Sequence, residues 1–101
     1  MIYVIASIKV KASCQDKFLV LFKANVGQVL REEGCLEYAP TVDFKTDLDI
    51  QQLDSTTVTI LEKWESIDHL HAHFVAPHMQ AYKSDVADLV ESVSLKILEG
   101  A

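Results

Sequence analysis

The 101-residue sequence has little glycine, proline or cysteine, with 3 glycines, 2 prolines and 2 cysteines. So few Gly and Pro residues argue against a disordered or low-complexity chain. No apolar run approaches the ~20 residues that a membrane-spanning helix needs. Basic residues are also scarce, since 9 Lys and Arg stand against 15 Asp and Glu and give a net charge of −6. An acidic chain does not neutralise phosphates, so we expect neither nucleic acid nor an anionic membrane as a partner.

The length predicts a single domain over residues 1–101. The amino-terminal residues show neither a basic segment nor a small-residue cleavage site, so we expect a cytoplasmic protein. Cys14 and Cys35 flank a predicted helix over 14–33. Such a helix is about 30 Å long, which is too far for a disulfide between residues at its two ends. We therefore expect two free thiols, which are typical of a reducing compartment.

Hydrophobic periodicity predicts a strand over 2–11, followed by the helix. Ser13, with Asp16 three residues on, has the pattern of a capping box, and Gly34 is expected as the C′ residue that ends the helix. The apolar stripe of the helix consists of Phe18, Phe22, Val26, Val29 and Leu30. A second strand is expected over 35–44, with Leu36, Tyr38, Val42 and Phe44 on one face. Pro40 indicates an edge position or a bulge there.

The second half of the chain predicts a polar loop over 45–55 and a strand over 56–65. Ser66 is expected to cap a short helix that runs to Val75, and Pro77 to begin another. A last strand is expected over 92–99. The order β-α-β-β-α-α-β predicts a ferredoxin-like α+β fold, an antiparallel sheet with helices on one face. The opposite face would carry Tyr3, Ile5 and Leu61, so we expect a homodimer formed sheet to sheet.

Several polar residues break this apolar pattern and are candidates for function. Asn25 lies on or beside the helix stripe, either facing a pocket or bonding locally at the stripe edge. Glu62 shares a strand face with Val58, Ile60 and Trp64, so it points toward the core. Burial would raise the pKa of Glu62 and suit it to accept a proton, although a structural carboxyl fits the same pattern. Trp64 is either a core residue or part of a site.

Four histidines, His69, His71, His73 and His78, fall within ten residues. His73 lies at the border of an apolar helix face, where it could reach both a pocket and solvent. We expect His69 and His71 to be exposed. His78 follows Pro77 at a helix start, where it either contacts the substrate or only supports the backbone. No H-E-x-x-H pattern is present and no third ligand has an obvious position, so no metal is expected. Tyr38, Phe74 and Tyr82 either line an apolar pocket together with Phe22 or pack in the core.

Two sets of residues carry a family resemblance. One is Glu62–Ser66, His69-Leu70, Ala72-His73, Ala76–Met79 and Ala81-Tyr82, and the other is Glu33–Cys35, Tyr38–Pro40 and Val42-Asp43. The first set resembles the antibiotic biosynthesis monooxygenase domain, and the second resembles the small bacterial quinol monooxygenases within it. The resemblance implies a dimeric α+β barrel and an oxygenase without a cofactor, which uses dioxygen on an electron-rich quinol or phenol. It also implies that Asn25 would hydrogen-bond a substrate oxygen, Trp64 would stack on the ring, and His73 would take the proton. Glu62 would orient His73 or act as the base itself.

Two other functions stay open at this point. The family includes an isomerase of phosphorylated sugars, so an isomerase of a small phosphorylated or hydroxy-ketone metabolite is one alternative. The second is a non-catalytic dimer that binds a small aromatic. The haem-degrading members resemble the chain less, because their pattern has an Asn in the first strand and this chain has Ser7 there. No Gly-rich phosphate loop and no flavin or nicotinamide fingerprint is present, so we expect no cofactor.

Overall fold

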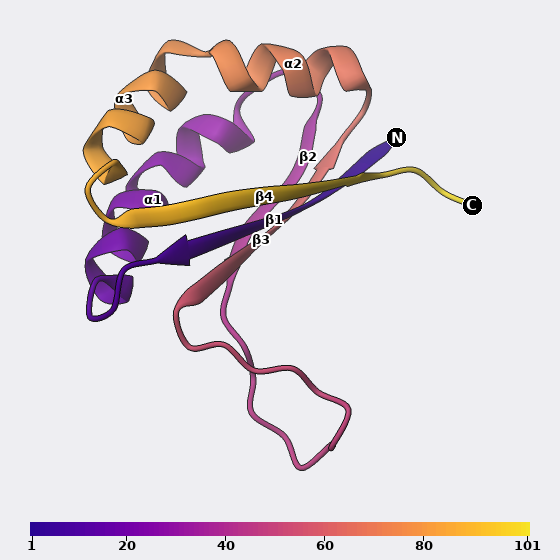
Figure 1. Ribbon diagram of the computed structural model, residues 1–101. Coiled ribbons are helices and arrows are strands. Elements are labelled where there is room, and N and C mark those ends of the chain that lie inside the picture. The colour runs from indigo at the N-terminus through magenta and orange to yellow at the C-terminus, as the bar shows by residue number, and fades with distance from the viewer.

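A computed structural model describes all 101 residues. Four antiparallel strands form one sheet in the order β2-β3-β1-β4, and three helices cover one of its faces (Figure 1). The elements are β1 (Ile2–Val10), α1 (Gln15–Leu30), β2 (Cys35–Thr41), β3 (Thr57–Trp64), α2 (Ile67–Val75), α3 (Pro77–Val86) and β4 (Val90–Leu98). The predicted ferredoxin-like α+β fold is confirmed.

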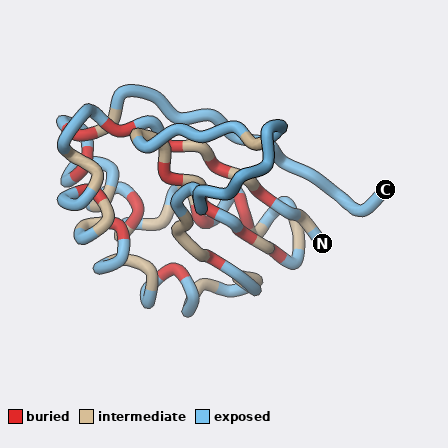
Figure 2. Tube along the Cα trace, turned by 90° about the horizontal axis from the view of Figure 1, so that it is seen from below, coloured by how far each residue is buried: buried red, intermediate tan, exposed pale blue.

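The two central strands, β1 and β3, bring their apolar faces under the helices. Alternate residues of β1 (Val4, Ala6, Ile8 and Val10) are buried, as are Val58, Ile60, Glu62 and Trp64 of β3. Val4 pairs with Glu62 and Ala6 with Ile60, so these side chains share one face of the sheet. Figure 2 shows the buried positions gathered along the inner sides of the sheet and helices.

The first helix begins later and ends earlier than the sequence predicts. Its N-cap is Cys14, without a side-chain cap, and Ser13 has a positive φ of 68°, so the predicted capping box is wrong. A left-handed backbone at Ser13 turns the chain too early for its side chain to cap the helix. The helix ends at Leu30, and Gly34 with φ of 81° lies in the turn that follows instead of at C′.

The second helix begins and ends as predicted, and the third begins at Pro77 as predicted and ends at Val86. The Ser66 hydroxyl accepts a hydrogen bond from the His69 backbone N–H, which caps α2. Ala76 is extended, as expected for a residue before proline, and Pro77 is the first residue of α3. This sharp break lets α2 and α3 follow each other across the same face of the sheet (Figure 1).

Strand β2 is an edge strand that contains Pro40, and its pairing with β3 is irregular between Cys35 and Glu37. Because of that irregularity Leu36 does not share the buried face of Tyr38 and is exposed. The strand stops at Thr41, so the prediction that it runs to Phe44 is wrong. Residues 42–56 form a long excursion beyond the sheet, which contains the predicted polar loop over 45–55 and is longer than it (Figure 1).

Strand β4, the other edge, is only partly covered. Val93 and Leu95 pair with Ile8 and Ala6, so they lie on the helix side of the sheet, yet they remain 58% and 43% exposed. The helices therefore leave one side of the apolar layer open along β4. None of the helices is long and apolar enough to cross a membrane.

Candidate active site

A cavity of about 310 Å³ lies between the sheet and the helices and opens beside β4. Its volume is at the small end of the range of roughly 300–1,000 Å³ for small-molecule sites. Its apolar wall is formed by Ala6, Ile8, Phe22, Ile60, Phe74, Met79, Val86, Ala87, Val90, Val93 and Leu95. The polar or titratable side chains at the wall are those of Tyr38, Glu62, His73, Tyr82 and Lys83. A small ligand that is mostly apolar and carries a few hydrogen-bonding groups fits this cavity best.

Glu62 is the carboxyl group of the cavity, and only 6% of the residue is exposed. Its Oε1 accepts a hydrogen bond of 2.9 Å from the indole Nε1 of Trp64. Burial raises the pKa of Glu62 to about 7, although the hydrogen bond from Trp64 opposes the shift and the nearby Glu32 charge adds to it. Near neutral pH this carboxyl is therefore divided between its acid and its carboxylate form.

His73 is 1% exposed, and its Nδ1 lies 2.8 Å from Oε2 of Glu32. A carboxylate at this distance accepts a hydrogen bond from the Nδ1–H group. The neutral ring therefore carries its proton on Nδ1 and its lone pair on Nε2. Burial lowers the pKa of His73 below its ordinary value, while the hydrogen bond to Glu32 acts in the opposite direction. His73 is thus a neutral base whose tautomer is fixed by the hydrogen bond to Glu32.

Four polar residues of the cavity wall each have a side-chain atom that makes no hydrogen bond within the chain. These atoms are Nε2 of His73, the second oxygen of Glu62 and the hydroxyls of Tyr38 and Tyr82. Because every fully buried side-chain nitrogen and oxygen has a hydrogen-bond partner, none of these four atoms is fully buried. Burial raises the pKa of Tyr38 and of Tyr82 well above the usual range, so both remain neutral O–H donors.

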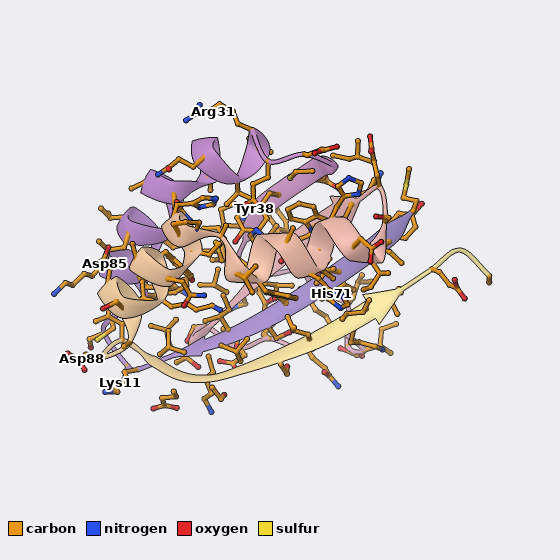
Figure 3. The ribbon with its side chains drawn as sticks, turned by 90° about the horizontal axis from the view of Figure 1, so that it is seen from above. Lys11, Arg31, Tyr38, His71, Asp85 and Asp88 are labelled. Atoms are coloured by element: carbon orange, nitrogen blue, oxygen red, sulfur yellow. The ribbon has the colours of Figure 1, made fainter.

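Aromatic rings frame these polar atoms. Phe22 stacks on Tyr38, with ring centroids 5.3 Å apart, and meets Tyr82 edge to face at 5.6 Å. Figure 3 shows Tyr38 inside the molecule beneath the helices, whereas Arg31 points away from it. Phe74 packs beside His73 with centroids 5.5 Å apart. The walls thus offer both flat and edge-on surfaces to a planar ring.

The structure brings six of the nine predicted site residues to the cavity: Phe22, Tyr38, Glu62, His73, Phe74 and Tyr82. Trp64 does not line it, because its ring is fully buried behind His73 at a centroid distance of 4.7 Å. Asn25 and His78 lie in a separate groove of about 220 Å³ between α1 and α3. Asn25 is held there by His78 and Met79, so neither it nor His78 reaches the cavity wall.

Glu32 is hydrogen-bonded to the candidate base His73, and the sequence does not predict this contact. The sequence places Glu32 only within the predicted helix over 14–33, and it is Glu62 that is expected to orient His73 or to act as the base itself. A signal was nevertheless present, because carboxylates after a helix C-terminus oppose the helix dipole and α1 has no basic residue in its last turn. The turn that carries Glu32 is fixed by Gly34, which packs on the ring of His69. His69 is therefore half-buried, not exposed as expected, whereas His71 is exposed.

Comparison with known proteins shows the family of the chain. The sequence profile of the family described as antibiotic biosynthesis monooxygenase matches residues 1–85. This chain belongs to the antibiotic biosynthesis monooxygenase family. A relative from Escherichia coli K12 named "Probable quinol monooxygenase YgiN" is 39% identical over 101 residues, which cover 98% of this chain and 97% of the relative. His, Cys, Asp and Glu side chains form no group of three or more that could hold a metal ion.

Several solved structures share the fold of this chain. A conserved protein from Methanosarcina mazei Go1 superposes with a TM-score of 0.84 at 22% identity, over 99% of this chain and 92% of that chain. An antibiotic biosynthesis monooxygenase of known crystal structure gives 0.83 at 22% identity, over 100% and 99% of the two chains. PA3566 from Pseudomonas aeruginosa gives 0.82 at 21% identity, over 99% and 93%.

Proposed function

We propose that this member of the antibiotic biosynthesis monooxygenase family oxidises a small quinol or phenol with dioxygen and without a cofactor. The observation that carries the proposal is the buried His73, which lines an apolar cavity with its Nε2 unpaired while Nδ1 is hydrogen-bonded to Glu32. Such a histidine can remove a proton from an aromatic hydroxyl at neutral pH. The relative named as a probable quinol monooxygenase supports the same substrate class.

The chemistry uses the electrons of the substrate. His73 takes the proton of the substrate hydroxyl at Nε2, and the resulting anion is electron-rich enough to reduce dioxygen. For a naphthoquinol the balanced outcome is one hydroxynaphthoquinone and one water, with one oxygen atom of dioxygen retained in the quinone. Both hydrogens of the water come from the substrate, so the protons that the protein takes up return to the departing oxygen atom. Tyr38 and Tyr82 are neutral O–H donors that stabilise the anionic oxygen, and such stabilisation is often the largest catalytic contribution.

Glu62 and Lys83 complete the cavity. Glu62 accepts a second proton, because the burial that raises its pKa to about 7 makes it a base near neutral pH. Trp64 holds one oxygen of this carboxyl and leaves the other free. The Lys83 ammonium lies over the Phe74 ring, 6.0 Å from its centroid, and supplies positive charge next to the substrate anion. Lys83 is the only cationic side chain at the wall, which favours an aromatic anion over a phosphorylated sugar.

Oxygen uptake by the metal-free protein with reduced naphthoquinol tests the function. We expect protein-dependent uptake above autoxidation that a chelator leaves unchanged. His73→Ala should lower it about 10²–10⁴-fold, as expected for loss of a general base. The matched control is His71→Ala, because His71 lies on the same helix and is exposed (Figure 3). No uptake above autoxidation across several quinols would reject the substrate class, and equal loss in both variants would reject the role of His73.

We further propose that the protein acts as a homodimer in the cytoplasm. Tyr3 and Leu61, on the sheet face away from the helices, are 38% and 40% exposed, and Phe44 and Ile50 of the long loop are 81% and 93% exposed. A second copy of the chain that covers these apolar groups would remove them from water, which favours the dimer. Light scattering should give twice the monomer mass, and Leu61→Lys should shift the protein to monomer. A wild-type monomer at working concentration would contradict the dimer.

A further inference from the structure

Tyr82 lines two hollows of the molecule at once. It is the only residue that lines both the cavity of about 310 Å³ and the separate groove of about 220 Å³ between α1 and α3. The wall of the cavity is mostly apolar, whereas the groove is lined by the polar side chains of Asn25, Gln28, His78 and Asp85. The Tyr82 side chain therefore separates an apolar space from a polar one.

The position of Tyr82 follows from the periodicity of α3. Residues three or four apart lie on the same face of a helix. His78 and Asp85 of this helix line the groove. Met79 and Val86 line the cavity. Tyr82 comes four residues after His78 and four residues before Val86, so it stands where the two faces of the helix meet.

Side chains of α1 hold the Tyr82 ring in this place. Helices α1 and α3 lie side by side on the sheet (Figure 3). Phe18 and Phe22 of α1 each meet the Tyr82 ring edge to face, with ring centroids 6.5 Å and 5.6 Å away. Asn25 donates a hydrogen bond of 3.4 Å from Nδ2 to the sulfur of Met79. Because Asn25 lines the groove and Met79 lines the cavity, this bond closes the boundary beside the ring.

We propose that the Tyr82 ring determines substrate size by closing the cavity toward α1. The inference rests on the proposed function and narrows its substrate class to quinols small enough to end at this ring. A larger group on the substrate can extend only through the side that opens beside β4, where Val93 and Leu95 are exposed. The cavity without the groove is at the small end of the range for small-molecule sites, which fits a quinol of two fused rings.

Removal of the ring should join the cavity and the groove into one space. In Tyr82→Ala a ligand of three fused rings can place its outer ring beside Asn25 and Gln28, whose side-chain amides can hydrogen-bond hydroxyl groups on that ring. Tyr82→Phe removes the hydroxyl but keeps the ring and its contacts with Phe18 and Phe22. The two variants therefore separate the size limit, which belongs to the ring, from hydrogen bonding to the substrate, which belongs to the hydroxyl.

Quenching of Trp64 fluorescence measures binding without turnover. Trp64 is the only tryptophan, and its ring centroid lies 4.7 Å from that of His73 at the cavity wall. The probes are lawsone, a hydroxyquinone of two fused rings, and alizarin, one of three. Tyr82→Ala should raise the affinity for alizarin relative to lawsone by about tenfold or more, since a misfit of one methylene is already worth roughly 10–200-fold. Tyr82→Phe should leave this ratio unchanged, as should Leu21→Ala, because Leu21 lines the groove but not the cavity.

The side-chain amide signals of Asn25 and Gln28 in NMR spectra report where the third ring lies. Alizarin added to Tyr82→Ala should shift both signals, because its outer ring enters the groove that these amides line. Alizarin added to the wild type should leave them in place, and so should lawsone added to either protein. Tighter alizarin binding in Tyr82→Ala without a shift of these amides would overturn the proposal, since the ring would then leave the cavity elsewhere.

The size limit and the proposed function fail in distinguishable ways. If the wild-type protein binds lawsone but does not oxidise quinols, the proposed function fails and the affinity ratio still decides the role of Tyr82. A ratio that stays unchanged in folded Tyr82→Ala, or that changes equally in Tyr82→Phe, overturns the size limit. Tyr82→Leu serves as a second variant if Tyr82→Ala does not fold, because it keeps an apolar contact with Phe18 and Phe22 but lacks the outer part of the ring. Its ratio should change in the same direction.

Discussion

Glu62 is expected to make the protein less stable as the pH rises. Its pKa in the folded state is about 7, against an ordinary value of 4.5, because burial penalises the carboxylate. Between these two values the folded protein holds a proton that the unfolded chain has released. The free energy of unfolding therefore falls with pH in this window, by about 1.4 kcal/mol per pH unit, and the total loss is about 3 kcal/mol.

The perturbation that isolates this effect is Glu62→Gln. The amide has the shape of the protonated acid and its oxygen can still accept the 2.9 Å hydrogen bond from Trp64. At pH 5 the variant should match the wild type. At pH 8 it should be more stable by about 3 kcal/mol, which corresponds to a melting temperature roughly 10–20 °C higher for a domain of this size.

Thermal and urea unfolding from pH 4.5 to 8.5 measure the difference between the two proteins. His73 contributes in the opposite direction, because its pKa is lowered and its stability contribution rises with pH, but both proteins share this contribution. Glu65→Gln, at an exposed carboxyl next to β3, is the control and should follow the wild type. A Glu62→Gln variant that is destabilised equally at every pH would refute the raised pKa.

Three further substitutions or reactions follow from the same packing. Gly34→Ala should destabilise the fold by about 1–3 kcal/mol in urea unfolding, since its φ is 81° and an added Cβ would lie 2.3 Å from Cγ of His69. Trp64→Phe removes the hydrogen bond that lowers the pKa of Glu62, so NMR titration should show that pKa raised further and unfolding a loss of about 1–3 kcal/mol. Burial raises the pKa of Cys35 to about 11 from 9.0, so its alkylation at pH 7.5, followed by mass spectrometry, should be about 100-fold slower than that of an unperturbed thiol. Wild-type stability in Gly34→Ala, an unchanged pKa of Glu62 in Trp64→Phe, or alkylation of Cys35 at the rate of an unperturbed thiol would each contradict the contact or burial on which that prediction depends.

Much of the fold follows from local patterns that the sequence displays. The alternation in β1 and β3 is strict, so the side of each strand that faces the helices could be predicted, including the inward Glu62. Ser66 and Pro77 mark helix starts through side-chain capping and a fixed φ, and both occupy the expected positions. These signals depend only on neighbours along the chain.

The parts that were missed depend on three-dimensional contacts or on backbone angles. The left-handed φ of Ser13 displaces the start of α1, and nothing in the residue type demands it. Glu32 and His73 are 41 residues apart, and their hydrogen bond exists only because the turn at Gly34 packs on α2. Trp64 was expected beside a substrate, but the β3 register places its ring behind His73 and its N–H on Glu62.

The most direct test of the central claim is labelling of the product with ¹⁸O₂. The metal-free protein turns over reduced naphthoquinol under labelled dioxygen, and mass spectrometry measures how many ¹⁸O atoms the product contains. Proton removal by His73 in the cavity predicts one labelled oxygen atom per hydroxynaphthoquinone, at a rate that falls about 10²–10⁴-fold in His73→Ala. Unlabelled quinone with hydrogen peroxide, or label that forms equally fast in His73→Ala, would contradict a monooxygenase centred on His73.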